Sequence, residues 1–433
     1  MTTIPWLGQV RHPVGAARHA FKITLGKMFQ ASPSNSTDVE VPYFKSISVQ
    51  WHGVQLSQEI RMWATPAERR DLAVRTGDLL ICEGGDVGRS AIYDGPDGFI
   101  FEKSVHRARP IDGSSTRYFW YVLQALHGSD WLDVLCNKAT IRHLTGEKLA
   151  SLEIPIPPQE EQRRIAHFLD AETSHIDRLR AKRREQMELL DERRTAALAE
   201  CVSLSGPDSV RHPLVGTVSR SWPVLPLRRV IPAVNVGVVI NPSTYFEEDG
   251  VPFIHGFNVR SGWIDPHGMK FMSSDSNEEL GRSRVYSGDV LVVRAGSPGR
   301  AAVVTEEYDG ANCASVLILR RGQAMLPQFL SAFINSPAGQ GQVQLSQYGA
   351  AQEVISAAQA LSFVAPVPNL AEQQYRVDRL NAALEAQNRV LSKIQHQASL
   401  LSERRQALIT AAVTGQFDVF TASGRNVIEG VTV

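Results

Sequence analysis

The chain of 433 residues is long enough for two or three domains, each with a core of its own. Its hydrophobic content of 43%, charged content of 21% and zero formal net charge are ordinary for a globular protein and give no general basic signature for nucleic acid. The absence of a long apolar run, of a signal-peptide-like start and of any CxxC pair among four scattered cysteines predicts a cytoplasmic protein without membrane anchor, disulfide framework or zinc knuckle.

The first globular part, residues 1–155, is rich in glycine, β-branched residues and short apolar runs, which indicates strands joined by tight turns. The apolar run at 78–82 predicts a strand, and the glycine loop at 84–89 closes a hairpin and ends in Arg89. Glycine in such a loop often serves only the turn. The alternative is that the bare backbone approaches a DNA phosphate and Arg89 follows it.

Two basic stretches follow in the first part. Residues 103–109 alternate in character and predict an edge strand with one solvated face, which offers Lys103, His106 and Arg107 as DNA contacts. The second stretch contains no acidic residue, and its candidates for DNA contact are Lys138, Thr140, Arg142 and His143. These side chains are either ordinary surface residues or phosphate contacts.

A helical spacer is predicted at residues 156–206. Pro157 and Pro158 end the preceding secondary-structure element, and no further proline or glycine occurs before Gly206. The stretch is crowded with charge, yet apolar residues recur in steps of three and four, which predicts one long helix with a narrow apolar seam.

The second globular part, residues 207–365, has the same layout. Its glycine loop at 295–300 ends in Arg300, and Arg294 and Ser297 are further candidates for DNA contact. Where the first part is basic, the second is rich in amides, and amides and arginines are the side chains that read base edges. The amide-rich candidates are Gln347, Tyr348 and Gln352.

A second helical spacer with a C-terminal tail is predicted at residues 366–433 and carries the heptad pattern more clearly. We expect the two helices to pair as an antiparallel coiled coil, because a parallel pair would need the linker to run back along the whole rod. The alternative, in which each helix packs back on its own domain, fits a narrow seam less well. The predicted inter-helix seam comprises Leu169, Ile176, Met187, Leu190, Val377, Leu380, Leu384, Leu391, Ile394, Leu401 and Leu408.

A single offset relates the two halves of the chain from residue 77 onwards, whereas upstream the register slips by small insertions and deletions. Adding 211 to residues 77–89 leads to residues 288–300, with coinciding glycine, apolar and arginine positions. The same offset leads from the end of the first globular part to the end of the second, and from the first helix to the second. The sequence therefore predicts an α+β protein with an internal pseudo-twofold repeat, in which two similar globular domains are separated by two long helices.

The sequence holds no convincing catalytic constellation. Asp78, Glu83 and Lys103 have the residue types of a metal-nuclease triad, but the repeat has Arg294 where the first copy has Glu83. Residues 241–245 lack the second proline of the amino-methyltransferase motif, and neither a phosphate-binding P-loop nor a metal-binding histidine spacing occurs. We expect a chain that contributes no catalytic residue and binds no metal.

Several motifs carry a family resemblance. The most specific is Leu-Glu-Ile-Pro-Ile-Pro-Pro-Gln-Glu-Glu-Gln-Arg-Arg-Ile-Ala at residues 152–166, followed by Phe-Leu-Asp at 168–170. Residues 408–415 and the glycine loops of both globular parts are equally typical. Over nearly its whole length the sequence resembles the specificity subunit of type I restriction–modification systems. One departure is Asn369, which stands where the first copy has Pro158.

This resemblance implies two target recognition domains, each of which reads one half of a split, asymmetric sequence in double-stranded DNA. It also implies that the helices set the spacing of the halves and dock two methyltransferase subunits, which bind S-adenosylmethionine and methylate adenine. Restriction translocase–nuclease subunits join with ATP and magnesium, and the chain itself is a non-catalytic subunit without a cofactor. The alternative function is a protein scaffold, in which two adaptor domains on a coiled coil bind protein partners, and the zero net charge is its best support.

Overall fold

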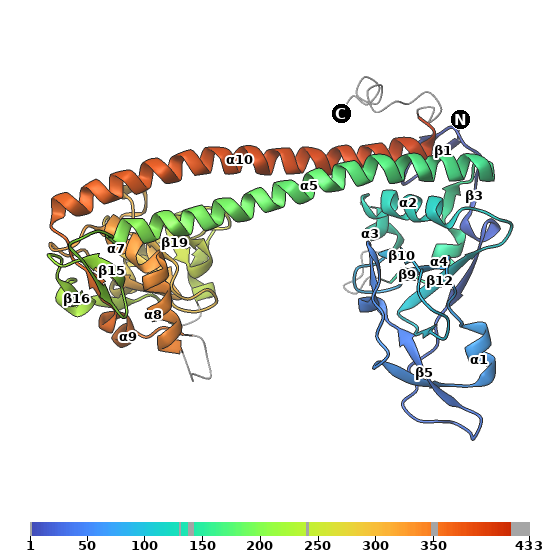
Figure 1. Cartoon of the computed structure of the whole chain (residues 1–433), viewed down its shortest axis with the longest axis horizontal. Coiled ribbons are helices and arrows are strands. Elements are labelled where there is room, and N and C mark those ends of the chain that lie inside the picture. Colours follow the sequence, from blue (N-terminus) through green and yellow to red (C-terminus); the bar gives the residue numbers. More distant parts are fainter. Residues whose placement is uncertain (1, 130, 137–142, 240–241, 348–353, 417–433) are drawn as a thin grey trace. The chain divides into compact units, whose positions relative to one another are not determined.

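A computed structural model describes residues 2–129, 131–136, 143–239, 242–347 and 354–416 (Figure 1). The chain forms two compact units. Unit 1 comprises the residues up to Arg183 and those from Gln395 onwards, and unit 2 comprises the residues from Arg184 to Ile394. This division falls inside the long helices α5 (Gln159–Val202) and α10 (Leu370–Thr414), whereas the boundaries expected from the sequence lie at the ends of the globular parts.

The core of unit 1 is built on a four-stranded antiparallel sheet in the order β10-β9-β12-β4. Alternate residues of β9 enter different apolar clusters, Leu79 and Ile81 on one face and Leu80 and Cys82 on the other. Both faces of the sheet are therefore covered, which explains the continuous apolar run at this strand. The strands are β4 (Phe21–Leu25), β9 (Leu79–Cys82), β10 (Ser90–Ile92) and β12 (Val105–Pro110).

Smaller sheets and short helices complete the globular part of unit 1. A three-stranded sheet has the order β11-β5-β8, with β11 parallel to β5, and the other strands form two-stranded ribbons. The strands are β1 (Thr2–Ile4), β2 (Gly8–Val10), β3 (Val14–Ala16), β5 (Val39–Phe44), β6 (Val49–Gln50), β7 (Gly53–Val54), β8 (Arg61–Ala64), β11 (Ile100–Phe101) and β13 (Glu153–Pro155). The helices are η1 (Ala17–His19), η2 (Ser46–Ser48), α1 (Pro66–Asp71), α2 (Thr116–His127), α3 (Trp131–Leu135) and α4 (Gly146–Ser151).

Unit 2 repeats this topology with one additional strand, β18, so its second sheet has the four-stranded order β18-β22-β19-β25. Its four-stranded sheet β24-β23-β26-β17 corresponds to β10-β9-β12-β4, and the parallel pair β19–β25 corresponds to β5–β11. The strands are β14 (Ser209–His212), β15 (Gly216–Ser219), β16 (Val224–Pro226), β17 (Val234–Val236), β18 (Phe246–Glu247), β19 (Val251–His255), β20 (Val259–Arg260), β21 (Trp263–Ile264), β22 (Lys270–Met272), β23 (Val290–Val293), β24 (Ala301–Val303), β25 (Asn312–Ala314), β26 (Val316–Leu319) and β27 (Val364–Pro366). The predicted α+β class and internal repeat are confirmed.

The short helices of unit 2 surround the sheets as they do in unit 1. They are η3 (Leu227–Arg229), η4 (Pro242–Tyr245), η5 (Gly256–Asn258), α6 (Ser274–Glu279), η6 (Gly281–Ser283), η7 (Glu306–Tyr308), α7 (Pro327–Asn335), α8 (Pro337–Gln347) and α9 (Ala357–Ser362). Helix α7 packs on β24 with eight of its nine residues buried, so it has no polar face and belongs to the core.

In unit 1, the start of α5 and the end of α10 complete the core. Helix α2 lies between the sheet and α5, where Arg117 and Tyr121 bond to Asp170 (Figure 1). The apolar residues that the two long helices add to this core are Ile165, Ala166, Leu169 and Ile176 from α5 and Leu408, Ile409, Ala412 and Val413 from α10. Each helix end is thus part of the domain core as well as of the helix pair.

In unit 2, the end of α5 lies against the start of α10. Arg194 and Leu384 line one hollow, and further along α5 the Glu200 carboxylate accepts a bond of 2.7 Å from Arg379. The Arg376 guanidinium donates to the backbone carbonyl of Glu200 at 3.0 Å. Contacts that advance along α5 move backwards along α10, so the helices are antiparallel, as predicted.

Burial along both helices follows the predicted seam. Leu169, Ile176, Val377, Leu380, Ile394 and Leu408 are buried, and Met187, Leu190, Leu384, Leu391 and Leu401 are half-buried. None of these eleven residues is exposed, although most of their neighbours on the same helices are. Among the described residues, no helix is long and apolar enough to cross a membrane.

Candidate nucleic-acid interface

The glycine loop of unit 1 joins β9 to β10 and bends sharply. Gly85 and Gly88 have φ angles of 73° and 81°, a left-handed conformation that side chains disfavour. The Arg89 guanidinium at the end of the loop donates to the Ser46 carbonyl at 3.0 Å and lies 3.4 Å from the Asp86 carboxylate. Arg89 therefore ties the loop to the η2 turn and leaves little of its side chain exposed.

The glycine loop of unit 2, between β23 and β24, has the same backbone and different side chains. Gly299 has a φ of 88°, and a Cβ there would lie 2.9 Å from a methyl group of Val343, so α8 packs directly on the loop. Arg300 is exposed, and Arg294 and Ser297 are half-buried. The loop from Arg294 to Arg300 carries no acidic residue, whereas the loop in unit 1 carries Glu83 and Asp86.

Three chain segments meet at the first residue of each glycine loop. In unit 1, the Glu83 amide donates to the Ser104 carbonyl at 2.9 Å, and the Glu83 carbonyl accepts from the Leu144 amide at 2.8 Å. In unit 2, the Arg294 amide donates to the Ser315 carbonyl at 3.0 Å, and the Arg294 carbonyl accepts from the Ile355 amide at 3.1 Å. We call this arrangement the loop junction of each unit.

The loop junction brings together several of the residues expected to contact DNA. Lys103 is exposed one residue before Ser104, and His143 is exposed one residue before Leu144. In unit 2, Gln347 is the last residue of α8 and is half-buried. Lys138, Thr140, Arg142, Tyr348 and Gln352 lie outside the described residues, so their contacts stay predictions.

His106 and Arg107 lie away from the surface. The expectation of an edge strand with a solvated face is wrong at this point, because β12 lies between β9 and β4 in the interior of the sheet. The His106 Nε2 atom is 2.7 Å from the Leu144 carbonyl oxygen, and the side chain is buried, which lowers its pKa. The Arg107 guanidinium is also buried and donates to the Ala73 carbonyl at 2.6 Å. These positions support a structural role.

A Gly-Asp motif precedes β9 at residues 77–78 and β23 at residues 288–289, and its aspartate forms an ion pair inside each unit. Asp78 contacts Arg109 at 2.6 Å, and the equivalent Asp289 contacts Arg320 at 2.5 Å. Asp78 also accepts the amide of Arg75 at 2.8 Å, as expected for a turn residue. Asp78 and Glu83 stand at opposite ends of β9, and among the described residues no cluster of histidine, cysteine or acidic side chains could hold a metal ion.

Sequence reasoning missed the short turn that lies beside each loop junction. The Ser46 amide donates to the Ser104 hydroxyl at 3.0 Å, which fixes η2, and the exposed side chain of Ile47 forms its tip. In unit 2, the exposed Phe257 forms the tip of η5, and its ring stacks on His255 at 5.2 Å. An exposed apolar residue at the same place in both copies was the available signal.

Comparison with known proteins finds similar sequences and a similar fold. The model of the type I restriction modification DNA specificity domain matches residues 26–189. The EcoBI specificity subunit of Escherichia coli is 22% identical over 353 residues, which cover 78% of this chain and 73% of the relative. The MjaVIII specificity subunit of Methanocaldococcus jannaschii is 22% identical over 330 residues, which cover 72% of this chain and 73% of the relative.

A solved structure has a similar fold. It comes from work on complex assembly and conformational transition of the type I R-M system and aligns with a TM-score of 0.67 at 17% sequence identity. The alignment covers 96% of this chain and all of that one. At this identity the likeness concerns the fold alone.

Proposed function

Because the chain belongs to the family of type I restriction–modification specificity subunits, we propose that each unit reads one half of a split DNA sequence through its loop junction. The observation that carries this proposal is the pair of loop junctions. Each has the same backbone bonds, and the equivalent positions hold different side chains, such as Glu83 and Arg294. A shared scaffold with different side chains suits two half-sites of different sequence.

In this proposal the chain performs no chemistry. Two methyltransferase subunits with S-adenosylmethionine modify adenine, and translocase–nuclease subunits with ATP and magnesium restrict unmodified DNA. The long helices offer these partners a docking surface, as the resemblance to specificity subunits implies. Leu189 and Val390 in unit 2 and Leu400 in unit 1 are exposed apolar side chains on these otherwise polar helices.

Footprinting of the complex of this chain with its methyltransferase subunits tests the proposal. Two protected patches about one helical turn apart are expected on DNA that carries the target. One continuous patch, or no protection, would contradict it. Mapping of methylated adenines in the host genome identifies the target, because it should return one split motif.

Salt dependence separates this function from a protein scaffold without DNA binding. If six to ten phosphates are contacted, the affinity should fall by about 10³-fold or more between about 50 and 200 mM salt. The scaffold alternative, which the zero net charge favours, predicts no binding to DNA at low salt beyond that of an unrelated neutral protein.

The two loop arginines allow a test within one half-site. Arg300→Ala should weaken binding to the half read by unit 2 by about 1–3 kcal/mol if the exposed guanidinium reads a base. Arg89→Ala should affect the other half, and it should also loosen η2, since Arg89 bonds to the Ser46 carbonyl. Titration of each variant complex with DNA altered in one half at a time measures both effects, and unchanged affinity would assign the loops to turn formation alone.

A further inference from the structure

The loop between β4 and β5 of unit 1 is exposed and uncharged along most of its length. All seven residues from Ala31 to Thr37 are exposed, as are Met28 and Phe29, with exposed fractions of 63% and 53%. The stretch from Met28 to Thr37 contains no acidic or basic residue and is rich in serine, asparagine and threonine. Such a loop, without an apolar core of its own, is ordinarily free to adopt many conformations.

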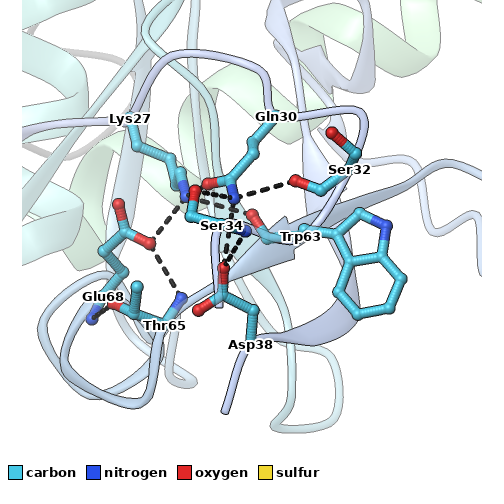
Figure 2. Close-up of polar contacts among 8 residues, drawn as sticks. All are labelled: Lys27, Gln30, Ser32, Ser34, Asp38, Trp63, Thr65 and Glu68. Carbon is cyan, nitrogen blue, oxygen red and sulfur yellow. Dashed lines mark hydrogen bonds and ion pairs between the residues drawn. The ribbon is translucent and has the colours of Figure 1, made fainter. Parts of the chain in front are cut away.

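A lysine holds the base of this loop. The Lys27 ammonium group donates to the Gln30 side chain at 2.8 Å, to the Trp63 carbonyl at 3.0 Å and to the Glu68 carboxylate at 2.6 Å (Figure 2). All three donor positions of the lysine are therefore used within the unit. Burial alone would raise the pKa of Glu68, but the bonds from Lys27 and Thr65 and the lysine charge lower it below its ordinary value.

A glutamine and an aspartate hold the rest of the loop. The Gln30 amide nitrogen, whose two hydrogens are shared among three acceptors, lies 3.0 Å from the Ser32 carbonyl, 2.8 Å from the Ser34 hydroxyl and 3.2 Å from the Asp38 carboxylate (Figure 2). The same carboxylate accepts the Ser34 amide at 2.7 Å. These bonds order the loop before any partner arrives, which lowers the entropic cost of binding.

The second unit has an exposed apolar residue at the equivalent point. Leu25-Gly26-Lys27-Met28 corresponds to Val236-Gly237-Val238-Val239 at the offset of 211, and Val239 is 75% exposed. A Cβ on Gly26 would collide with the Glu102 carbonyl, and one on Gly237 would lie 2.7 Å from the Cys313 carbonyl. Close backbone packing at these two glycines thus fixes where the strand ends in each unit, and the exposed apolar residue follows it.

The chemistry of the unit 1 loop favours DNA as the partner. Hydroxyl and amide groups bond to phosphates and base edges without the repulsion that carboxylates would cause, and apolar side chains contact thymine methyl groups or unstacked bases. The exposed Lys103 lies at the base of the loop, since its amide donates to the Lys27 carbonyl at 2.8 Å. Strand β5, into which the loop leads, lies on the side of unit 1 away from the part of α5 that belongs to this unit (Figure 1).

We propose that residues 28–37 form a preordered reading loop that enters a groove of the DNA half-site read by unit 1. Met28 and Phe29 make apolar contacts with base edges, and the residues from Ser32 to Thr37 bond to bases and phosphates. Val239 makes the corresponding apolar contact in the half-site read by unit 2. This inference rests on the proposed function and adds to the loop junction a second point of sequence readout in each unit.

The test uses the assembled methyltransferase complex and a DNA library in which each half-site is varied separately. The double variant Met28→Ala/Phe29→Ala should reduce discrimination among bases in one half at least tenfold and leave the other half unchanged. Val239→Ala should reduce discrimination among bases in the half read by unit 2 and leave the half read by unit 1 unchanged. Gln30→Ala keeps the apolar residues but removes the four contacts of the Gln30 side chain with Lys27, Ser32, Ser34 and Asp38. It should therefore also weaken binding to the half-site read by unit 1 and speed amide hydrogen exchange in the loop.

Ile111→Ala is the matched control, because Ile111 is an apolar residue of unit 1 with an exposed fraction of 58% that lies outside the loop. Thermal unfolding should be the same for this control and for the double variant. Unchanged discrimination in the double variant, or equal loss in both halves, overturns the reading loop while the proposed function stands. Failure of the double variant to assemble with the methyltransferase subunits also overturns it and assigns the loop to protein docking. If the wild-type complex shows no sequence-specific binding, the proposed function itself fails.

Discussion

Asp78 and Asp289 show how one residue can serve the fold of both units. Each stands directly before an interior strand of its sheet and is almost fully buried. Asp78 forms an ion pair with Arg109 on the neighbouring strand β12, and Asp289 with Arg320, which directly follows β26. Each also accepts a backbone amide three residues earlier in the chain, from Arg75 and Tyr286 respectively. The Gly-Asp motif is thus explained by turn geometry and charge pairing.

Removal of this carboxylate should destabilise its unit. Asp289→Ala leaves the Arg320 guanidinium, which is mostly buried, without its anion, and we expect a loss of about 3 kcal/mol in the free energy of unfolding. Denaturant unfolding of the full chain measures the loss. Asp249→Ala is the control, because Asp249 is exposed in the same unit and should change stability by less than about 0.5 kcal/mol. Equal effects of the two substitutions would contradict the role of the pair.

His106 should make unit 1 sensitive to mild acid. Burial lowers its pKa below the ordinary 6.5, although the bond to the Leu144 carbonyl and the charge of Glu83 oppose this. The unfolded chain therefore takes up a proton at a higher pH than the native chain, and the stabilisation is lost as the pH falls from about 6.5 towards the lower native value. Calorimetry between about pH 7 and pH 5 should show a falling Tm, with a shallower slope in His106→Gln.

A slope that is identical in the wild type and in His106→Gln would show that His106 does not contribute. His12 and His255 also have pKa values lowered by burial, so the slope in His106→Gln should be reduced and not abolished.

The residues that sequence reasoning misplaced are those whose position depends on partners far along the chain. An alternating basic stretch indicates a strand with two different faces, but it does not reveal whether another strand or helix covers the polar face. His106 is covered by a segment 38 residues later, at Leu144, and Arg107 by the backbone at Ala73, 34 residues earlier. By contrast, the turn role of Asp78 was predictable because its amide partner is local.

At the scale of elements, the long helices were the most predictable part of the chain. Their heptad spacing is a local property, so the seam residues followed from the sequence. The antiparallel pairing followed from the reach of the linker between the two helices. What the spacing could not show is that each end of the seam continues into a domain core. Leu408 and Ile409, near the end of α10, are buried in unit 1, although the globular part of that unit ends before residue 160.

Truncation of Leu408 should therefore destabilise unit 1. The side chain is 3% exposed, and Leu408→Ala should lower the free energy of unfolding by about 2–5 kcal/mol. Leu400→Ala, on the same helix with an exposed fraction of 48%, should cost much less. Hydrogen exchange of the β9–β12 sheet reports on unit 1, and it should become faster in the first variant alone. Faster exchange confined to α10 would show that the helix end does not contribute to that core.

At the scale of the whole molecule, the duplication has a functional consequence. A constant offset of 211 predicted two units with one topology, and both the sheet order and the loop-junction bonds repeat. The surfaces do not repeat, because Glu83 has become Arg294 and the polar loop that follows Phe29 has a different counterpart in unit 2. The target sequence could not be predicted, because base readout depends on such side chains and on the DNA that they meet, and the repeat constrains neither.

The proposed spacer role of the helices leads to a prediction about the DNA target. Deletion of one heptad from each helix, residues 184–190 and 388–394, shortens both helices by about 10 Å, close to the rise of about three base pairs. A heptad preserves the seam, so pairing should persist and the preferred gap between half-sites should shrink, or methylation should cease, while the bases recognised in each half stay the same. The matched control deletes the heptad from α5 alone, which shortens α5 by about 10 Å relative to α10 and should prevent assembly of an active complex. Methylation mapping on a library of half-sites with varied gaps distinguishes these outcomes, and a change in the recognised bases themselves would show that the helices do more than set the spacing.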